Sequence, residues 1–94
     1  MADLIHLSAT VEGKVQGVYY RAFTAHVAKS LGIKGYVRNV TRTGDVELEA
    51  EGEKKDLEEM LRQLKIGPPE AMVEEIDTEW SPYTGKYNSF DVRY

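Results

Sequence analysis

The spacing of the hydrophobic residues changes several times along this chain, and the order of these changes restricts the fold more than any other feature. Alternate residues are apolar from Ile5 to Val11, which predicts a strand with one buried face. From Tyr20 to Leu31 apolar residues recur every three or four positions, which predicts a helix that ends at Gly32. The same rule then predicts strands at 33–41 and 46–51, a helix around 57–64, and strands at 72–80 and 90–94.

Glycine and proline separate these segments. Gly52 is expected to end the third strand, and Gly67-Pro68-Pro69 to end the second helix. Residues 41–45 form a turn, so the strands on either side make a hairpin. The even-numbered positions of Met72, Ile76, Thr78 and Trp80 indicate the fourth strand. The order predicts an α+β fold, a ferredoxin-like βαββαβ sandwich with an antiparallel sheet, two helices on one face and a short extra C-terminal strand.

Composition limits the classes of protein to be considered. The 94 residues suit a single domain over 1–94, and 41% hydrophobic with 30% charged residues is typical of a soluble globular protein. A net charge of −4 disfavours nucleic acid and anionic membranes as partners, and the size favours a monomer. The lack of cysteine excludes disulfides and thiolate metal sites. No apolar run is long enough to span a membrane and the first residues lack a basic region, so we expect a cytoplasmic protein. The high glutamate content weakly favours a thermophilic source.

A glycine-containing loop leads from the first strand into the first helix. Gly13 and Gly17 permit backbone conformations in which N–H groups turn inward around an anion, with the helix N-terminus behind them. Arg21 lies in the first helical turn, where the helix dipole disfavours a cation unless an anion shares the site. The alternative is a surface arginine that pairs with a nearby glutamate. The two glycines favour the anion site.

Asn39 is the second candidate, because asparagine is depleted in strands. Its amide could hold a water molecule or an oxyanion, although it has no useful pKa for acting as a base. The alternative is an ordinary asparagine at the end of a strand.

The remaining polar residues indicate no second site. His6 alternates with apolar residues and is expected to face solvent, and His26 lies off the apolar stripe of its helix. Neither histidine has a partner at metal-ligand spacing, so no metal site is expected. Glu74 and Glu75 should point in opposite directions. The glutamates of the third strand are expected to form a solvated face: Glu47, Glu49 and Glu51.

Three segments resemble the acylphosphatase family. Residues 13–21, with the sequence Gly-Lys-Val-Gln-Gly-Val-Tyr-Tyr-Arg, resemble its first signature, and Gly35-Tyr36-Val37-Arg38-Asn39 resembles the second. Residues 88–94 are similar to its C-terminal strand. The resemblance implies hydrolysis of the carboxyl–phosphate bond of a small acyl phosphate, without metal or organic cofactor. It implies that Arg21 binds phosphate and that Asn39 positions the attacking water. The implied phosphate-binding residues are Val15, Gln16, Gly17, Val18, Tyr19, Tyr20 and Arg21.

The sequence departs from the family pattern at one place, and it leaves two alternative functions open. Four residues separate Asn39 from Gly44, where the family usually has three, so the hairpin loop is longer at its tip. A non-catalytic anion-binding module could use the same loop. An RNA-recognition domain shares the order of elements, but the net charge of −4 and the glutamates of the third strand disfavour it.

Overall fold

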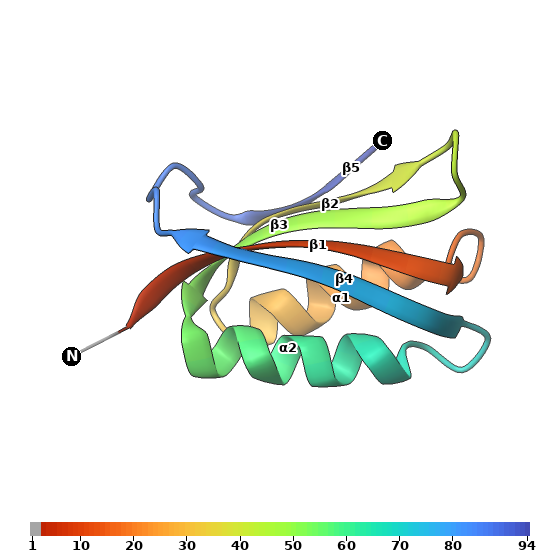
Figure 1. Cartoon of the computed structure of the whole chain (residues 1–94), viewed down its shortest axis with the longest axis horizontal. Coiled ribbons are helices and arrows are strands. Elements are labelled where there is room, and N and C mark those ends of the chain that lie inside the picture. Colours follow the sequence, from red (N-terminus) through yellow and green to blue (C-terminus); the bar gives the residue numbers. More distant parts are fainter. Residues whose placement is uncertain (1–2) are drawn as a thin grey trace.

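The computed structural model describes residues 3–94, and within them the helices and strands follow the predicted order (Figure 1). In chain order they are β1 Leu4–Lys14, α1 Tyr20–Ser30, β2 Lys34–Val40, β3 Asp45–Glu53, α2 Lys54–Ile66, β4 Met72–Pro82 and β5 Phe90–Arg93. The βαββαβ order with a short last strand is therefore confirmed.

The strands form one sheet in the order β4-β1-β3-β2-β5. The four longer strands pair antiparallel, whereas β5 pairs parallel with β2, from Gly35 opposite Phe90 to Arg38 opposite Arg93. Both helices lie on the same face of the sheet (Figure 1). This is the predicted ferredoxin-like sandwich, and the last strand extends the sheet at the β2 edge.

The helices begin and end where the sequence indicates. Helix α1 is followed by Gly32 and α2 by Gly67, and both glycines have positive φ, 71° and 69°. This left-handed conformation ends a helix and is unfavourable for residues with a side chain. Within residues 3–94, no helix combines the length and the hydrophobicity needed to cross a membrane.

The core lies between the helices and the sheet. Alternate residues of the two central strands β1 and β3 point toward the helices and are buried, and α2 contributes residues spaced three or four apart. Burial of each valine, leucine or methionine side chain stabilises the fold by about 1.5–3 kcal/mol. The core residues from these three elements include Leu7, Ala9, Val11, Val46, Leu48, Ala50, Leu57, Met60 and Leu64.

A bulge changes which residues of β4 face the core. The register between β1 and β4 shifts at Glu12/Gly13, where Gly13 has φ 130° and comes so close to the Met72 carbonyl that a Cβ would overlap it. Beyond the bulge Val73 packs against the core, and Met72 is 69% exposed. Met72 therefore does not share the core-facing side of β4 with Ile76 and Trp80, because the inserted residue reverses the alternation of the strand.

Strand β3 continues through Gly52, which was predicted to end it. Gly52 pairs with Ile5, and the next residue, Glu53, pairs with Leu4. Because β1 supplies partners for the backbone of β3 beyond the glycine, the ladder continues up to the start of α2.

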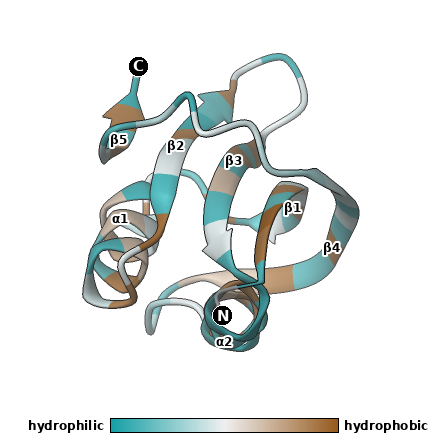
Figure 2. Cartoon of the chain, turned by 90° about the vertical axis from the view of Figure 1, so that its left-hand side faces the viewer, coloured by the Kyte–Doolittle hydropathy of each residue, from teal (hydrophilic) through white to brown (hydrophobic). Residues whose placement is uncertain are grey.

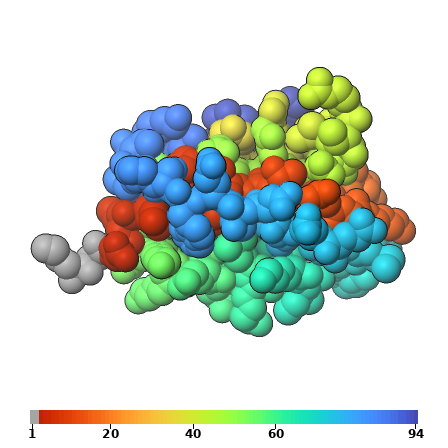
Figure 3. All heavy atoms as spheres, viewed as in Figure 1, coloured from red at the N-terminus to blue at the C-terminus, as the bar shows by residue number. Residues whose placement is uncertain are grey.

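The face of the sheet opposite the helices is partly covered, contrary to expectation. His6 is 6% exposed and Glu51 is 3% exposed, so the predictions of a solvent-facing histidine and a solvated Glu51 were wrong. The segment between β4 and β5 covers them as it passes from one edge of the sheet to the other (Figure 2). In the space-filling view its atoms, in blue, lie close to the start of β1, in red (Figure 3). Glu47 and Glu49 remain half-buried.

Candidate active site

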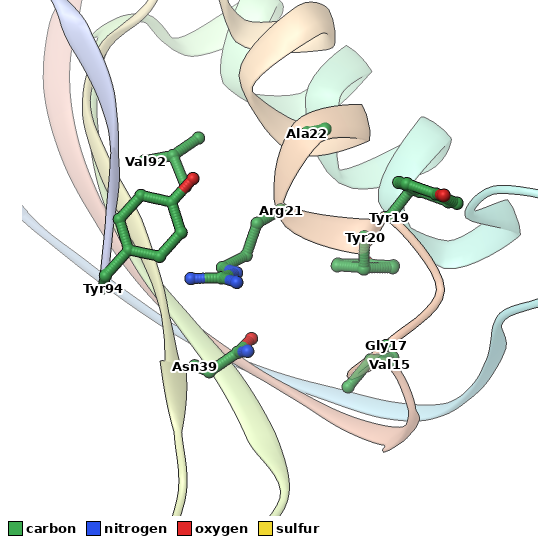
Figure 4. A pocket seen from close by; sticks show the side chains of 9 residues that line it. All are labelled: Val15, Gly17, Tyr19, Tyr20, Arg21, Ala22, Asn39, Val92 and Tyr94. Atoms are coloured by element: carbon green, nitrogen blue, oxygen red, sulfur yellow. The ribbon is translucent and has the colours of Figure 1, made fainter.

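A pocket of about 410 Å³ lies where the loop before α1 meets the ends of β2 and β5. Arg21 and Asn39 both line it, although they come from different elements. Figure 4 shows the Arg21 side chain extending across the pocket toward Tyr94 and Asn39. The full lining is Val15, Gly17, Tyr19, Tyr20, Arg21, Ala22, Asn39, Val92 and Tyr94.

The backbone of the loop leaves its N–H groups free. Gly17 and Tyr19 are both left-handed, with φ 72° and 61°, and Tyr19 is the residue that precedes α1. A left-handed residue followed by a helical one makes successive N–H groups converge on a small anion. Within residues 3–94, the N–H groups of residues 16–22 donate to no acceptor, and α1 has no side-chain cap. The loop therefore has the conformation and the unused donors of an anion site.

The last strand holds the Arg21 guanidinium in place. The Nη1 of Arg21 donates a hydrogen bond of 3.0 Å to the Arg93 carbonyl oxygen, and the Cζ of Arg21 lies 4.6 Å from the centre of the Tyr94 ring. No acidic residue occupies the first turn of α1. The cation is thus oriented by a carbonyl and an aromatic ring rather than neutralised by a carboxylate, so its charge is available to an anion.

Asn39 lies within β2, opposite Val46 of β3. Its Oδ1 is buried and has no hydrogen-bond partner among the described residues. A buried amide oxygen without a partner is costly in a folded protein, and such atoms usually bind a ligand or a water molecule. The Asn39 side chain therefore offers an acceptor beside the Arg21 guanidinium.

Several of the other residues predicted to bind phosphate have side chains that contact the core or neighbouring strands. Val15 and Val18 are buried in the core, and the Tyr20 hydroxyl donates a 2.7 Å hydrogen bond to the Leu64 carbonyl. The Gln16 side chain donates to the carbonyl oxygens of Val40 and Asp45, at 3.2 and 2.9 Å. These side chains anchor the loop to the core and to the β2–β3 hairpin.

Comparison with known proteins places these features in a family. The acylphosphatase family model matches residues 7–92. The chain belongs to the acylphosphatase family. A Dehalococcoides mccartyi protein named acylphosphatase is 48% identical over 88 residues, which are 94% of this chain and 97% of that protein. An acylphosphatase structure from Bacillus subtilis has a TM-score of 0.92 at 30% identity, covering 96% of this chain and 99% of that one. One from Coxiella burnetii has a TM-score of 0.88 at 37% identity, covering 96% and 93%.

Membership of the acylphosphatase family settles the class of activity. The chain is a hydrolase that cleaves the carboxyl–phosphate bond of acyl phosphates, and the alternative of a non-catalytic anion-binding module is not favoured. The pocket described above is the candidate location of this acylphosphatase chemistry, because it combines unused N–H donors, a free cation and an unpartnered amide oxygen.

Three pocket residues were not predicted, namely Ala22 of α1 and, from the C-terminal segment, Val92 and Tyr94. The alternation of the last segment indicated a strand but not its neighbour. Only the parallel pairing of β5 with β2 brings Val92 and Tyr94 to Arg21. The similarity of residues 88–94 to the acylphosphatase C-terminal strand was the only available signal.

A group of carboxylates lies away from this pocket, at the bulge between β1 and β4. The carboxylate oxygens of Glu12, Glu75 and Asp77 lie within 4.8 Å of one another. The hydrogen bond and the negative charge of Asp77 raise the pKa of Glu12 to about 7. None of these residues lines the acylphosphatase pocket.

Proposed function

We propose that the N–H groups of residues 15–20 and the Arg21 guanidinium bind the phosphoryl group of an acyl phosphate, and that Asn39 positions the water that attacks it. The observation that supports this most is the convergence of unused polar groups on one pocket. The free N–H groups, the oriented cation and the unpartnered Asn39 oxygen all lie at this end of the sheet.

The chemistry of an acyl phosphate explains why so few side chains suffice. Its leaving group is a carboxylate, whose conjugate acid has a pKa near 4, so it departs without a general acid. The transition state of phosphoryl transfer is loose and asks little of the nucleophile, so a strong base is not required. The site has to stabilise negative charge and align the water with the phosphorus.

Arg21 and the N–H groups of the loop together stabilise the negative charge of the phosphoryl group. Only one N–H donor of Arg21 is used by the Arg93 carbonyl, so others remain for phosphoryl oxygens. The N–H groups of the loop and of the first turn of α1 add fixed dipoles that need no reorganisation during the reaction. Together they neutralise the equatorial oxygens of the phosphoryl group.

Asn39 aligns the attacking water with the phosphorus. Its Oδ1 accepts a hydrogen bond from the attacking water and holds an oxygen lone pair toward the phosphorus. An amide does not remove a proton from that water, so the proton leaves with solvent or with the product phosphate. This role matches the loose transition state, which does not depend on a strong nucleophile.

Replacement of Asn39 by alanine tests this assignment. We expect kcat for benzoyl phosphate to fall by about 10²-fold, while inhibition by inorganic phosphate stays within about twofold, because only the water loses its partner. Gln63→Ala, which changes a side-chain amide on α2 outside the pocket, is the matched control. If Asn39→Ala kept nearly full kcat, or lost phosphate binding together with kcat, the water-positioning role would be wrong.

We also propose that this single domain acts as a monomer in the cytoplasm, without metal, cofactor or nucleic acid. A mechanism carried by backbone N–H groups and one guanidinium has no step that calls for a metal. The net charge of −4 disfavours nucleic acid. We expect kcat to be unchanged after treatment with EDTA, and the chain to elute as a monomer in size-exclusion chromatography. Loss of activity that added metal restores would refute metal independence.

A further inference from the structure

The segment that joins β4 to β5, residues 83–89, is called the strap here. Because β4 and β5 are the opposite edges of the sheet, the strap has to cross the ends of β1, β3 and β2. Figure 2 shows it passing over the side of the sheet that the helices leave open. The strap therefore determines where β5 begins.

Glu51 anchors the strap from the sheet below. Its Oε2 accepts hydrogen bonds from the Thr84 N–H at 2.9 Å and the Thr84 hydroxyl at 2.7 Å, and its Oε1 accepts one from the Gly85 N–H at 2.9 Å. A fourth contact joins Oε2 to His6 Nδ1 at 2.6 Å. Burial alone raises the pKa of Glu51, but these hydrogen bonds outweigh it and lower the pKa to about 2. Glu51 is thus ionised and fully hydrogen-bonded.

His6 connects Glu51 to a second carboxylate. Its Nε2 lies 2.6 Å from Glu49 Oε1, which also accepts a hydrogen bond from the Ser8 hydroxyl at 2.7 Å. Both ring nitrogens therefore face carboxylate oxygens, which accept hydrogen bonds but do not donate them when ionised. When both carboxylates are ionised, each ring nitrogen needs a proton to make its contact, which corresponds to the imidazolium form. Burial lowers the pKa of His6, but the two carboxylates outweigh burial and raise it above its ordinary value.

The other elements around His6 contribute aromatic, hydroxyl and charged groups. The Tyr87 ring of the strap is stacked beside His6 at 6.2 Å, and Tyr36 of β2 lies 6.2 Å from Tyr87. Histidine is the one among the neighbouring side-chain types that ordinarily titrates near neutral pH. The further charged or polar groups near this cluster are Lys34 of β2, Glu79 and Ser81 of β4, and Lys86 of the strap.

Strand β5 follows directly from the strap, and its own pairing is short. It has four residues and pairs only with β2, in parallel. Its carbonyl at Arg93 and the Tyr94 ring that follows it are the groups that hold the Arg21 guanidinium. A change in the hydrogen bonds that anchor the strap would therefore shift β5 and, with it, the groups that position the Arg21 guanidinium.

We propose that protonated His6 is a positioning residue for anion binding: it holds Glu51 and the strap, and so fixes β5 and the Arg21 guanidinium. The proposal rests on the proposed role of Arg21 in binding phosphate. When His6 loses its proton, one ring nitrogen presents a lone pair to a carboxylate, so the cluster loses a contact and gains a repulsion. Anion affinity then falls as the pH rises through the pKa of His6.

Sulfate inhibition of benzoyl phosphate hydrolysis measures this effect, because the charge of sulfate stays constant above about pH 3, unlike that of phosphate. The pKa of His6 is measured by NMR on the same protein. From about pH 5 to about pH 9 we expect the sulfate Ki to rise by about threefold to tenfold, with its midpoint at the pKa of His6. His6→Gln should remove this step. His26→Gln, which changes the other histidine, exposed on α1, should keep it.

Glu49→Gln provides a second variant in case His6→Gln does not fold. Removal of one carboxylate lowers the pKa of His6, so the NMR midpoint and the sulfate step should move together to lower pH. The proposal is overturned if the two midpoints separate, if the folded wild-type enzyme shows no step, or if His6→Gln retains it. Arg21→Ala separates the two proposals: if it binds sulfate as tightly as the wild type at low pH, the proposed role of Arg21 fails, whatever His6 does.

Discussion

The polar groups at the two ends of the sheet differ in their hydrogen bonding. At the end where β1 finishes, the N–H groups of residues 16–22 and the Asn39 oxygen have no partner among the described residues. At the end where β1 starts, Glu51 accepts four hydrogen bonds and His6 contacts two carboxylates. Polar groups without a hydrogen-bond partner are available to a ligand, whereas hydrogen-bonded polar groups connect segments of the chain.

This difference predicts different consequences for mutations at the two ends. Changes at the open end should affect catalysis with little effect on folding, because those groups make few contacts within the protein. Changes at the end with Glu51 and His6, called the satisfied end, should mainly lower the free energy of unfolding.

The largest effect is expected at Arg21. Arg21→Ala removes the charged donor of the pocket, so kcat/KM for benzoyl phosphate should fall by about 10²-fold or more, and inhibition by inorganic phosphate should weaken as well. Thermal unfolding should change little, because within residues 3–94 the Arg21 side chain makes one hydrogen bond, to the Arg93 carbonyl. Arg62→Ala, on the exposed side of α2, is the control. Severe unfolding of Arg21→Ala at full specific activity would reverse the comparison.

Glu51→Gln tests the satisfied end. The amide keeps the size of the side chain but loses the charge, so one of its groups becomes a donor that faces the donors of Thr84 and Gly85. We expect the free energy of unfolding to fall by about 2–4 kcal/mol, measured by urea denaturation. Glu53→Gln is the control at the end of the same strand. A loss within the error of the control would contradict the anchoring role of Glu51.

Gln16 connects the open end to the rest of the protein and should show a smaller effect on catalysis. Gln16→Leu loses the hydrogen bonds to the carbonyls of Val40 and Asp45, which tie the loop before α1 to the β2–β3 hairpin. We expect the Ki for inorganic phosphate to rise by about threefold to tenfold. Gln63→Leu, which removes a hydrogen bond to Glu59 on α2, should leave the Ki unchanged. An unchanged Ki in both variants would exclude a role for Gln16 in positioning the loop.

The pH dependence of stability should be the mildest effect. The raised pKa of His6 means that its stabilisation is complete below the unfolded-state pKa of about 6.5 and is lost as the pH rises through the folded-state value. The lowered pKa of Glu51 means that its contribution is present above the unfolded-state value and is lost as the pH falls toward about 2. Urea unfolding at a series of pH values should therefore show a decline on the alkaline side that His6→Gln removes. Stability that rises there would contradict the charge assigned to His6.

The parts of the structure that could be predicted are those that depend on residues close in the sequence. Period-two and period-3.6 patterns located the strands and helices, and left-handed Gly32 and Gly67 end the helices as expected. The alternation along β4 does not extend to Met72, because one inserted residue at the β1–β4 bulge reverses it, and nothing in the sequence of β4 marks this bulge.

His6 shows the limit of prediction from periodicity. Alternation correctly placed it on the face opposite the helices, but it did not indicate that the strap covers this face. The partners of His6 are 43 and 45 residues away, and the strap residue Thr84 that shares Glu51 lies farther along the chain still. Burial of a side chain depends on what lies above it, which local sequence does not specify.

The sequence alone determined the order of the elements, the glycine-containing loop and the position of Arg21 in the first helical turn, because each depends on the conformational preferences of neighbouring residues. Tertiary structure decided that β5 pairs in parallel with β2, which brings the Arg93 carbonyl and the Tyr94 ring to Arg21 across 72 residues. It also decided that the His6–Glu51 cluster is buried. The reason is that the strap joins opposite edges of the sheet, so its path sets both the place of β5 and the exposure of the face it crosses.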